Sequence, residues 1–242
     1  LNGTVNGLAG NDTISATTAG VPQVITLTGA TSVTGFDGTF TPSINSAVTP
    51  ATFVGIETII GGNGQDTLIG RNVDANWTVA ATGSYAETVS GRMLTFSKIE
   101  NLNGGSGVDT YSISGTQNAN LNGGSGNDVF NFADGAVLNG SLVGCAGIDT
   151  VNFGNSADTV DLGRYNGIET LNGGGGNDTL LGLASGTTFN IDGLNTGTTT
   201  ISGVTQRFVS FENLTGAAGS DTFAFVDGGS LSGAINGGSG LD

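Results

Sequence analysis

The sequence predicts an all-β protein, built as a parallel β-solenoid with glycine-rich turns, coils of about 18–22 residues and no significant helix. Three observations lead to this prediction. One short motif of glycine and aspartate recurs along the whole chain, a β-prone stretch follows each copy, and no segment has convincing helical periodicity. A β-roll or a β-helix is the architecture that such a short repeat favours.

The first element is the turn. The pattern Gly-x-x-Gly-x-Asp occurs eight times, whereas the composition alone predicts roughly half an occurrence. Glycine permits positive φ and a close approach of the backbone, so the motif predicts a tight turn. The eight motif aspartates are Asp12, Asp66, Asp109, Asp128, Asp149, Asp178, Asp221 and Asp242.

A second acidic register supports the first. Four glutamates each lie nine residues before a motif aspartate, and one further aspartate lies nine residues after Asp149. The repeating unit therefore has about nine residues, with one acidic turn and one short strand. The five residues of this register are Glu57, Glu100, Asp158, Glu169 and Glu212.

The strand is the second element of each unit. The second residue after each acidic residue is apolar wherever the chain continues, and alternate side chains of a strand share one face. Two units make one coil, and stacked coils bury ladders of side chains that no coil buries alone. The predicted buried positions are Leu68, Leu102, Tyr111, Phe130, Val151, Leu171, Leu180, Leu214 and Phe223.

The repeats extend over the whole sequence, so residues 1–242 are expected to form a single continuous solenoid array. The chain starts and stops within repeats, and we expect it to be a fragment of a longer protein. Two segments lack the motif, at about 15–51 and about 70–92. Less regular coils that carry loops are expected there.

Composition narrows the functional classes. The chain has 20 acidic residues, 5 basic residues and no histidine, which gives a net charge of −15. Such a chain repels nucleic acid and attracts cations. The single cysteine excludes an internal disulfide framework and, with no histidine, makes zinc a poor candidate. No apolar run approaches the roughly 20 residues of a membrane span.

The motif resembles a known repeat. Gly-Gly-x-Gly-x-Asp followed by x-apolar-x is similar to the nonapeptide of the RTX (repeats-in-toxin) proteins, which form calcium-bound parallel β-rolls. Blocks that begin at Ile56, Ile99 and Ile168 resemble those in very large secreted bacterial surface proteins and adhesins. The resemblance implies Ca²⁺, held between successive turns by carbonyl groups and by the eight motif aspartates. Glu57, Glu100, Asp158, Glu169 and Glu212 are weaker candidates.

The residue types of the motif suit calcium, but the motif copies in this chain differ from the RTX pattern. Calcium takes six to eight oxygen ligands, and glycine-lined turns expose carbonyl groups. However, complete motifs are isolated here, Ala119, Gly140 and Gly233 replace acidic residues, and Leu8, Cys145 and Ala217 replace the second glycine. Fewer sites than motifs are therefore expected. Aspartates that cap turns without any metal are the structural alternative.

These patterns favour a non-catalytic, calcium-stabilised structural or adhesive segment of a large extracellular bacterial protein, such as a surface rod, matrix, sheath or filament. The alternatives are an accessory RTX β-roll of a secreted enzyme or toxin, and a calcium-free solenoid. An enzyme would need an acid–base group beside a cation, and only Lys98 with Glu100 and Arg164 with Glu169 come close. The expected partners are calcium ions and further copies of the repeat, end to end or side by side, with surface glycans left open and nucleic acid excluded.

Overall fold

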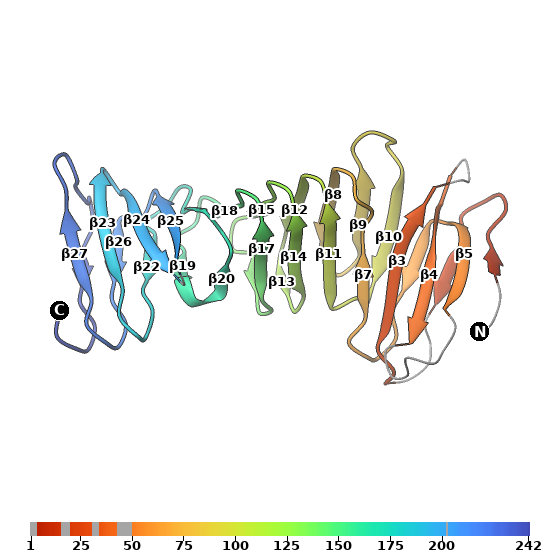
Figure 1. Cartoon of the computed structure of the whole chain (residues 1–242), viewed down its shortest axis with the longest axis horizontal. Helices are drawn as coiled ribbons and strands as arrows, with labels where there is room; N and C mark the ends of the chain where they lie inside the picture. The colour runs from red at the N-terminus through yellow and green to blue at the C-terminus, as the bar shows by residue number, and fades with distance from the viewer. Residues whose placement is uncertain (1–3, 16–19, 31–33, 43–49, 202) are drawn as a thin grey trace.

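The computed structural model describes residues 4–15, 20–30, 34–42, 50–201 and 203–242. Figure 1 shows an elongated molecule whose strands follow one another along the long axis, with the N- and C-terminal parts at opposite ends. The regular structure of these residues is β throughout, apart from one short 3-10 turn, η1 (Leu162–Arg164). The prediction of an all-β chain with parallel sheets is therefore confirmed.

Two large sheets contain most of the described strands. The first sheet runs in the spatial order β1 (Thr4–Asn6), β5 (Ala51–Ile56), β4 (Phe36–Pro42), β3 (Gln23–Gly29), β7 (Thr67–Ile69), β11 (Asn101–Ser106), β14 (Asn120–Ser125), β17 (Leu142–Ala146) and β20 (Tyr165–Asn166). The second sheet runs in the order β2 (Thr13–Ser15), β6 (Thr58–Ile60), β10 (Met93–Ser97), β9 (Gly83–Glu87), β8 (Ala75–Val79), β12 (Asp109–Ile113), β15 (Val129–Phe132), β18 (Thr150–Asn152), β21 (Thr170–Asn172), β25 (Val204–Val209), β24 (Thr196–Ile201), β23 (Thr188–Gly193) and β27 (Thr222–Phe225).

Two small parallel sheets complete the described structure. One consists of β13 (Thr116–Gln117) and β16 (Val137–Leu138). The other consists of β19 (Thr159–Asp161), β22 (Thr179–Leu181), β26 (Asn213–Thr215) and β28 (Ile235–Asn236). The chain passes from one sheet to the next and returns, so strands that are neighbours in a sheet come from different repeats.

The parallel strands are in register with the sequence repeat. In the second sheet Tyr111 lies opposite Phe130, Phe130 opposite Val151, and Val151 opposite Leu171. In the first sheet Leu102 lies between Leu68 and Leu121. The position two after the acidic residue therefore forms the ladders that the sequence predicts.

The core lies between the sheets and is formed by these ladders. Eight of the nine predicted positions are buried, and Trp77, Tyr111 and Phe130 stack with ring centroids 5.6 and 4.8 Å apart. Phe223 is the exception, because it is only partly buried. It lies on β27, the outermost described strand of the second sheet, and one of its faces stacks on Phe189.

Three antiparallel meanders interrupt the parallel order: β3–β4–β5, β8–β9–β10 and β23–β24–β25. In each one the chain advances past two strand positions and then returns to fill them. For example, β3 pairs with the later strand β7, whereas β5 pairs with the earlier strand β1. Strands β3 and β4 lie in the motif-free segment 15–51, part of which is outside the described residues, and β8 and β9 lie in 70–92.

Arginines hold the meanders in place. Arg71 forms an ion pair of 2.7 Å with Glu87 of β9, and Arg207 of β25 pairs at 3.2 Å with Asp192 of β23. Arg92, which precedes β10, donates to the carbonyl oxygens of Ala30 and Gly35. The first two meanders are thus tied to each other by Arg92.

Candidate cation site in the acidic turns

The motif aspartates lie inside the turns. Asp66, Asp109, Asp128, Asp149 and Asp178 have no exposed surface. Asp221 is also buried, Asp12 is half-buried and Asp242 is exposed. The five residues of the second register, Glu57, Glu100, Asp158, Glu169 and Glu212, are half-buried. Burying a carboxylate is costly unless it is hydrogen-bonded, protonated or bound to a cation.

One oxygen of each buried carboxylate has a clear partner. The backbone N–H of Asp109 donates to Asp128 Oδ1 at 2.8 Å, that of Asp128 to Asp149 Oδ1 at 2.7 Å, and that of Asp149 to Glu169 Oε2 at 2.7 Å. These residues are 19, 21 and 20 positions apart, which agrees with the 18–22 residues expected for one coil. We call Asp109, Asp128, Asp149 and Glu169 the long acidic row.

Shorter rows repeat the arrangement and contain the other candidate residues. Each acidic side chain again accepts the backbone N–H of an earlier acidic residue, which lies 20 or 21 positions before it, or 34 or 45 positions before it where a meander intervenes. The donor–acceptor pairs are Asp12–Glu57, Asp66–Glu100, Asp158–Asp178, Asp178–Glu212 and Asp221–Asp242. The glutamates therefore continue the aspartate rows. The sequence spacing contains this signal, because Glu169 follows Asp149 by one coil length.

The second oxygen of several of these carboxylates has no partner. Six buried carboxylate oxygens make no hydrogen bond within the described structure: Asp12 Oδ2, Glu57 Oε1, Asp109 Oδ2, Asp128 Oδ2, Asp149 Oδ2 and Asp178 Oδ2. Such atoms are rare in folded proteins, because an unpaired buried charge carries its full desolvation penalty. Each of them therefore marks a position for a proton or a cation.

Burial also changes the acidity of the long row. Desolvation raises the pKa of Asp109 to about 7, although a hydrogen bond from the Trp77 indole opposes the rise. Desolvation raises the pKa of Asp149 to about 6, and the charges of Asp128 and Glu169 add to the increase. Burial raises the pKa of Asp128 and Asp178 as well. The rise reflects the energetic cost of these charges when no cation is bound.

The first glycine of the motif makes room for the unpaired oxygen. A Cβ atom on Gly123 would lie 2.2 Å from Asp128 Oδ2, and one on Gly144 would lie 2.4 Å from Asp149 Oδ2. Any other residue at these positions would displace the carboxylate. The first motif position is therefore glycine for two reasons: the turn requires it, and the aspartate carboxylate occupies the space that a side chain would need.

Two motifs differ from the others. Asp66 Oδ2 accepts the N–H of Gly62 at 2.6 Å, and Asp221 Oδ2 accepts the N–H of Ala217 at 3.2 Å. Asp66 Oδ1 accepts the N–H of Gln23 at 2.7 Å, so both of its oxygens are satisfied by the backbone. In these two turns the aspartate acts as the cap that turn chemistry alone predicts.

The donor set of the remaining turns fits a hard cation. In the described part of the chain no group of three or more acidic, cysteine or histidine side chains converges on one point. A cation would therefore take at most two carboxylates from adjacent coils and complete its shell with backbone carbonyls or water. A glycine carbonyl lies close to the unpaired oxygen of Asp109, because a Cβ on Gly104 would lie 2.3 Å from the oxygen of Gly123 and 2.4 Å from Asp109 Oδ2.

A non-glycine residue at the second glycine position strains the turn. Cys145 has a φ of 76°, in the left-handed region, where the equivalent Gly124 has 99°. We expect Cys145→Gly to stabilise the protein by about 1 kcal/mol, since the left-handed backbone costs an L-residue that much or more. Thermal melting measures the gain. Gly124→Ala is the opposite case and should lower the melting temperature, because its Cβ would lie 2.1 Å from the oxygen of Gly105. A lower melting temperature for Cys145→Gly would contradict the interpretation.

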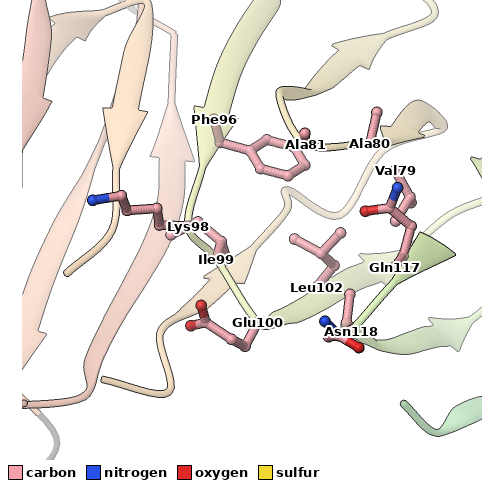
Figure 2. A pocket seen from close by; sticks show the side chains of 11 residues that line it. Val79, Ala80, Ala81, Phe96, Lys98, Ile99, Glu100, Leu102, Gln117 and Asn118 are labelled. Atoms are coloured by element: carbon pink, nitrogen blue, oxygen red, sulfur yellow. The ribbon is translucent and has the colours of Figure 1, made fainter. Parts of the chain in front are cut away.

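The residues weighed for catalysis do not form an acid–base pair. A hollow of about 160 Å³ lies beside Phe96, Leu102 and Gln117. Figure 2 shows that the Lys98 side chain is directed away from these residues. Glu100 is engaged elsewhere, since its Oε2 accepts the N–H of Asp66 at 2.8 Å. Arg164 donates to the carbonyl oxygen of Leu138 at 2.7 Å, and Glu169 belongs to the long acidic row.

Sequence comparison finds no known family model and no curated protein that matches the chain. Among the described residues, no helix has the length and apolar character needed to cross a membrane. Inferences about function therefore rest on the geometry of the turns and on the motif itself.

Proposed function

We propose that the chain is a non-catalytic structural segment, a parallel β-solenoid stiffened by calcium ions in its acidic turns. The observation that carries the proposal is the long acidic row, in which Asp109, Asp128 and Asp149 each bury one unpaired oxygen in successive coils. A cation between the coils would neutralise that charge and would join each turn to the next. Metal binding and folding would then be coupled.

The architecture supports this proposal. Partner strands recur every 19 to 21 residues along the long acidic row, which is the coil length of a short-repeat solenoid. The resemblance of the motif to RTX repeats supplies the choice of calcium and of an extracellular bacterial setting, such as a surface rod, matrix, sheath or filament. An accessory β-roll of a secreted enzyme or toxin is the alternative that the same resemblance allows.

Further copies of the repeat are the proposed protein partners. The outermost described strands β27 and β28 carry Phe225, which is 50% exposed, and Ile235, which is 42% exposed. A parallel strand edge with apolar side chains pairs readily with another strand of the same kind. End-to-end contact between repeats would cover both strands.

A calcium-free solenoid is the second candidate, and Asp66 favours it. Its two carboxylate oxygens are both satisfied by backbone N–H groups, so this turn needs no ion. If every acidic turn worked in this way, the rows would be hydrogen-bonding ladders, with the unpaired oxygens protonated. The two candidates differ in the state of the unpaired carboxylates, which are charged and bind calcium in the first candidate and are protonated in the second. This difference can be measured.

Asp128→Asn tests the choice. The amide keeps an oxygen for the Asp109 N–H but removes the charge, so calcium affinity at this row should fall about tenfold or more, the effect of losing a bond to a charged group. Without calcium the variant should melt no lower than the native chain, because a neutral side chain is cheaper to bury. Calorimetric titration with Ca²⁺ and melting curves with and without the ion provide both measurements.

Asp66→Asn is the matched control. Its amide nitrogen would face an N–H group, so this variant should lose stability equally with and without calcium. If Asp128→Asn leaves the amount of bound calcium unchanged and raises the melting temperature equally in both buffers, the calcium-free solenoid is correct.

A further inference from the structure

A shallow hollow on the outer face of the first sheet has no charged lining. It has a volume of about 380 Å³ and lies over β7, β11, β14 and β17, which are adjacent in the middle of the molecule (Figure 1). Its lining is uncharged and mixes apolar side chains, Leu102, Leu121 and Val143, with polar ones, of which Thr67, Asn101, Asn103, Asn120 and Asn122 are partly exposed. In a chain with 20 acidic residues, this hollow offers amide groups without charge.

The asparagines form two rows with different hydrogen bonding. Asn120 Nδ2 donates to Asn101 Oδ1 at 2.8 Å, Asn101 Nδ2 donates to the carbonyl of Asp66 at 3.2 Å, and Ser141 N–H donates to Asn120 Oδ1 at 3.0 Å. The polar groups of this row are therefore used within the protein, and the row holds the coils together.

The other row has free amides. Asn103 lies opposite Asn122, and in the described structure the Asn103 side chain makes no hydrogen bond. Asn122 uses only its Oδ1, which accepts the Cys145 thiol at 3.3 Å. Ile69 lies beside Asn103 on one side, and Val143 lies beside Asn122 on the other. Along the axis of the molecule, this row therefore has an aliphatic side chain at each end and two amide side chains between them.

This row fits a ligand with hydroxyl groups and apolar C–H faces. The Nδ2 groups of both asparagines offer donors to neighbouring hydroxyls, and Asn103 Oδ1 offers an acceptor. Adjacent strands place such groups about 4.8 Å apart. The aliphatic side chains at the two ends can pack against C–H groups of the ligand. Because the row has no charged side chain, it should not favour a charged ligand over a neutral one. We propose that the row Ile69–Asn103–Asn122–Val143 binds a neutral linear glycan that lies along the molecular axis, across the strands.

The proposal adds an adhesive role to the structural one, and it does not depend on a cation. Isothermal titration with cellohexaose, laminarihexaose, maltohexaose and mannohexaose, and with hexagalacturonic acid as the acidic probe, tests it. At least one neutral hexamer should bind, and the acidic hexamer should not. The double variant Asn103→Ala, Asn122→Ala should lower the affinity by about tenfold or more.

The control variant removes amides that are engaged with each other. Asn131 and Asn152 of the second sheet are bonded at 2.9 Å, and Asn131→Ala, Asn152→Ala should leave glycan affinity unchanged when both variants keep the native β circular dichroism. Failure of every neutral hexamer to bind, equal binding of the acidic hexamer, or unchanged affinity in the first variant would overturn the proposal. Self-association that the first variant abolishes, without glycan binding, would assign the face to a second copy. Repeating the titration with chelator separates this result from the calcium test.

Discussion

Without calcium, the melting temperature should fall as the pH is raised from 5 to 8. The pKa values of Asp109 and Asp149 are raised to about 7 and about 6 in the folded chain, against roughly 3.9 for an unfolded aspartate. Stability that depends on these protonated groups is fully present below pH 4 and is lost as the pH rises through 6 and 7. We expect a decrease of at least about 5 °C, the shift that a loss of roughly 2 kcal/mol produces in a chain of this size.

Calcium should remove this pH dependence. An ion beside Asp109, Asp128 and Asp149 would favour their charged forms, so the melting temperature at pH 8 should return to the value at pH 5 or exceed it. Melting curves at several pH values with Ca²⁺, with Mg²⁺ and with chelator measure the effect. If the β circular dichroism and the melting temperature at pH 8 stay the same after exhaustive chelation, the calcium proposal is wrong and the chain is a plain solenoid.

Phe130→Ala should cost about 3–5 kcal/mol of unfolding free energy, the usual cost of removing a buried phenylalanine ring. Phe130 has no exposed surface, lies in register between Tyr111 and Val151, and stacks on Tyr111 at 4.8 Å. The surrounding coils are fixed by parallel hydrogen bonds on both sides, so the cavity cannot readily close.

Denaturant unfolding at pH 5, with or without calcium, measures this loss without interference from the acidic rows. Phe225→Ala is the matched control, because its ring is 50% exposed on the outermost strand and should contribute less than 1 kcal/mol. Equal losses in the two variants would mean that the ladder register is not what stabilises the core.

The ladders were predictable because most of their members stand two positions after an acidic residue. Leu68, Tyr111 and Leu180 follow this local rule, and all are buried. The meanders were not predictable in this way. Strands β8 and β9 contain no motif, and the antiparallel pairing that places Trp77 opposite Tyr85 leaves no periodic trace in the sequence.

The candidate site was predictable at the level of residue type, but its hydrogen bonding was not. Asp66 and Asp128 occupy the same place in the same motif, yet only Asp128 keeps an unpaired oxygen. The difference depends on whether the backbone N–H of the second motif residue points at the carboxylate. The conformation of the turn decides this direction. Gly124 has positive φ, whereas Gly62 is not among the residues with positive φ.

The meanders also determine the order in which the chain can fold. Strand β25 pairs with the earlier strand β21. However, β23 comes before β25 in the sequence, and β23 pairs with the later strand β27. Winding from one end, coil by coil, would therefore leave a gap two strands wide at each meander. Paired residues in the meanders can be close in sequence, since Ile201 lies opposite Val204 and Ala86 opposite Met93, so these strands pair at little entropic cost. Folding should thus nucleate at three separate places, and the parallel stretches should grow between them.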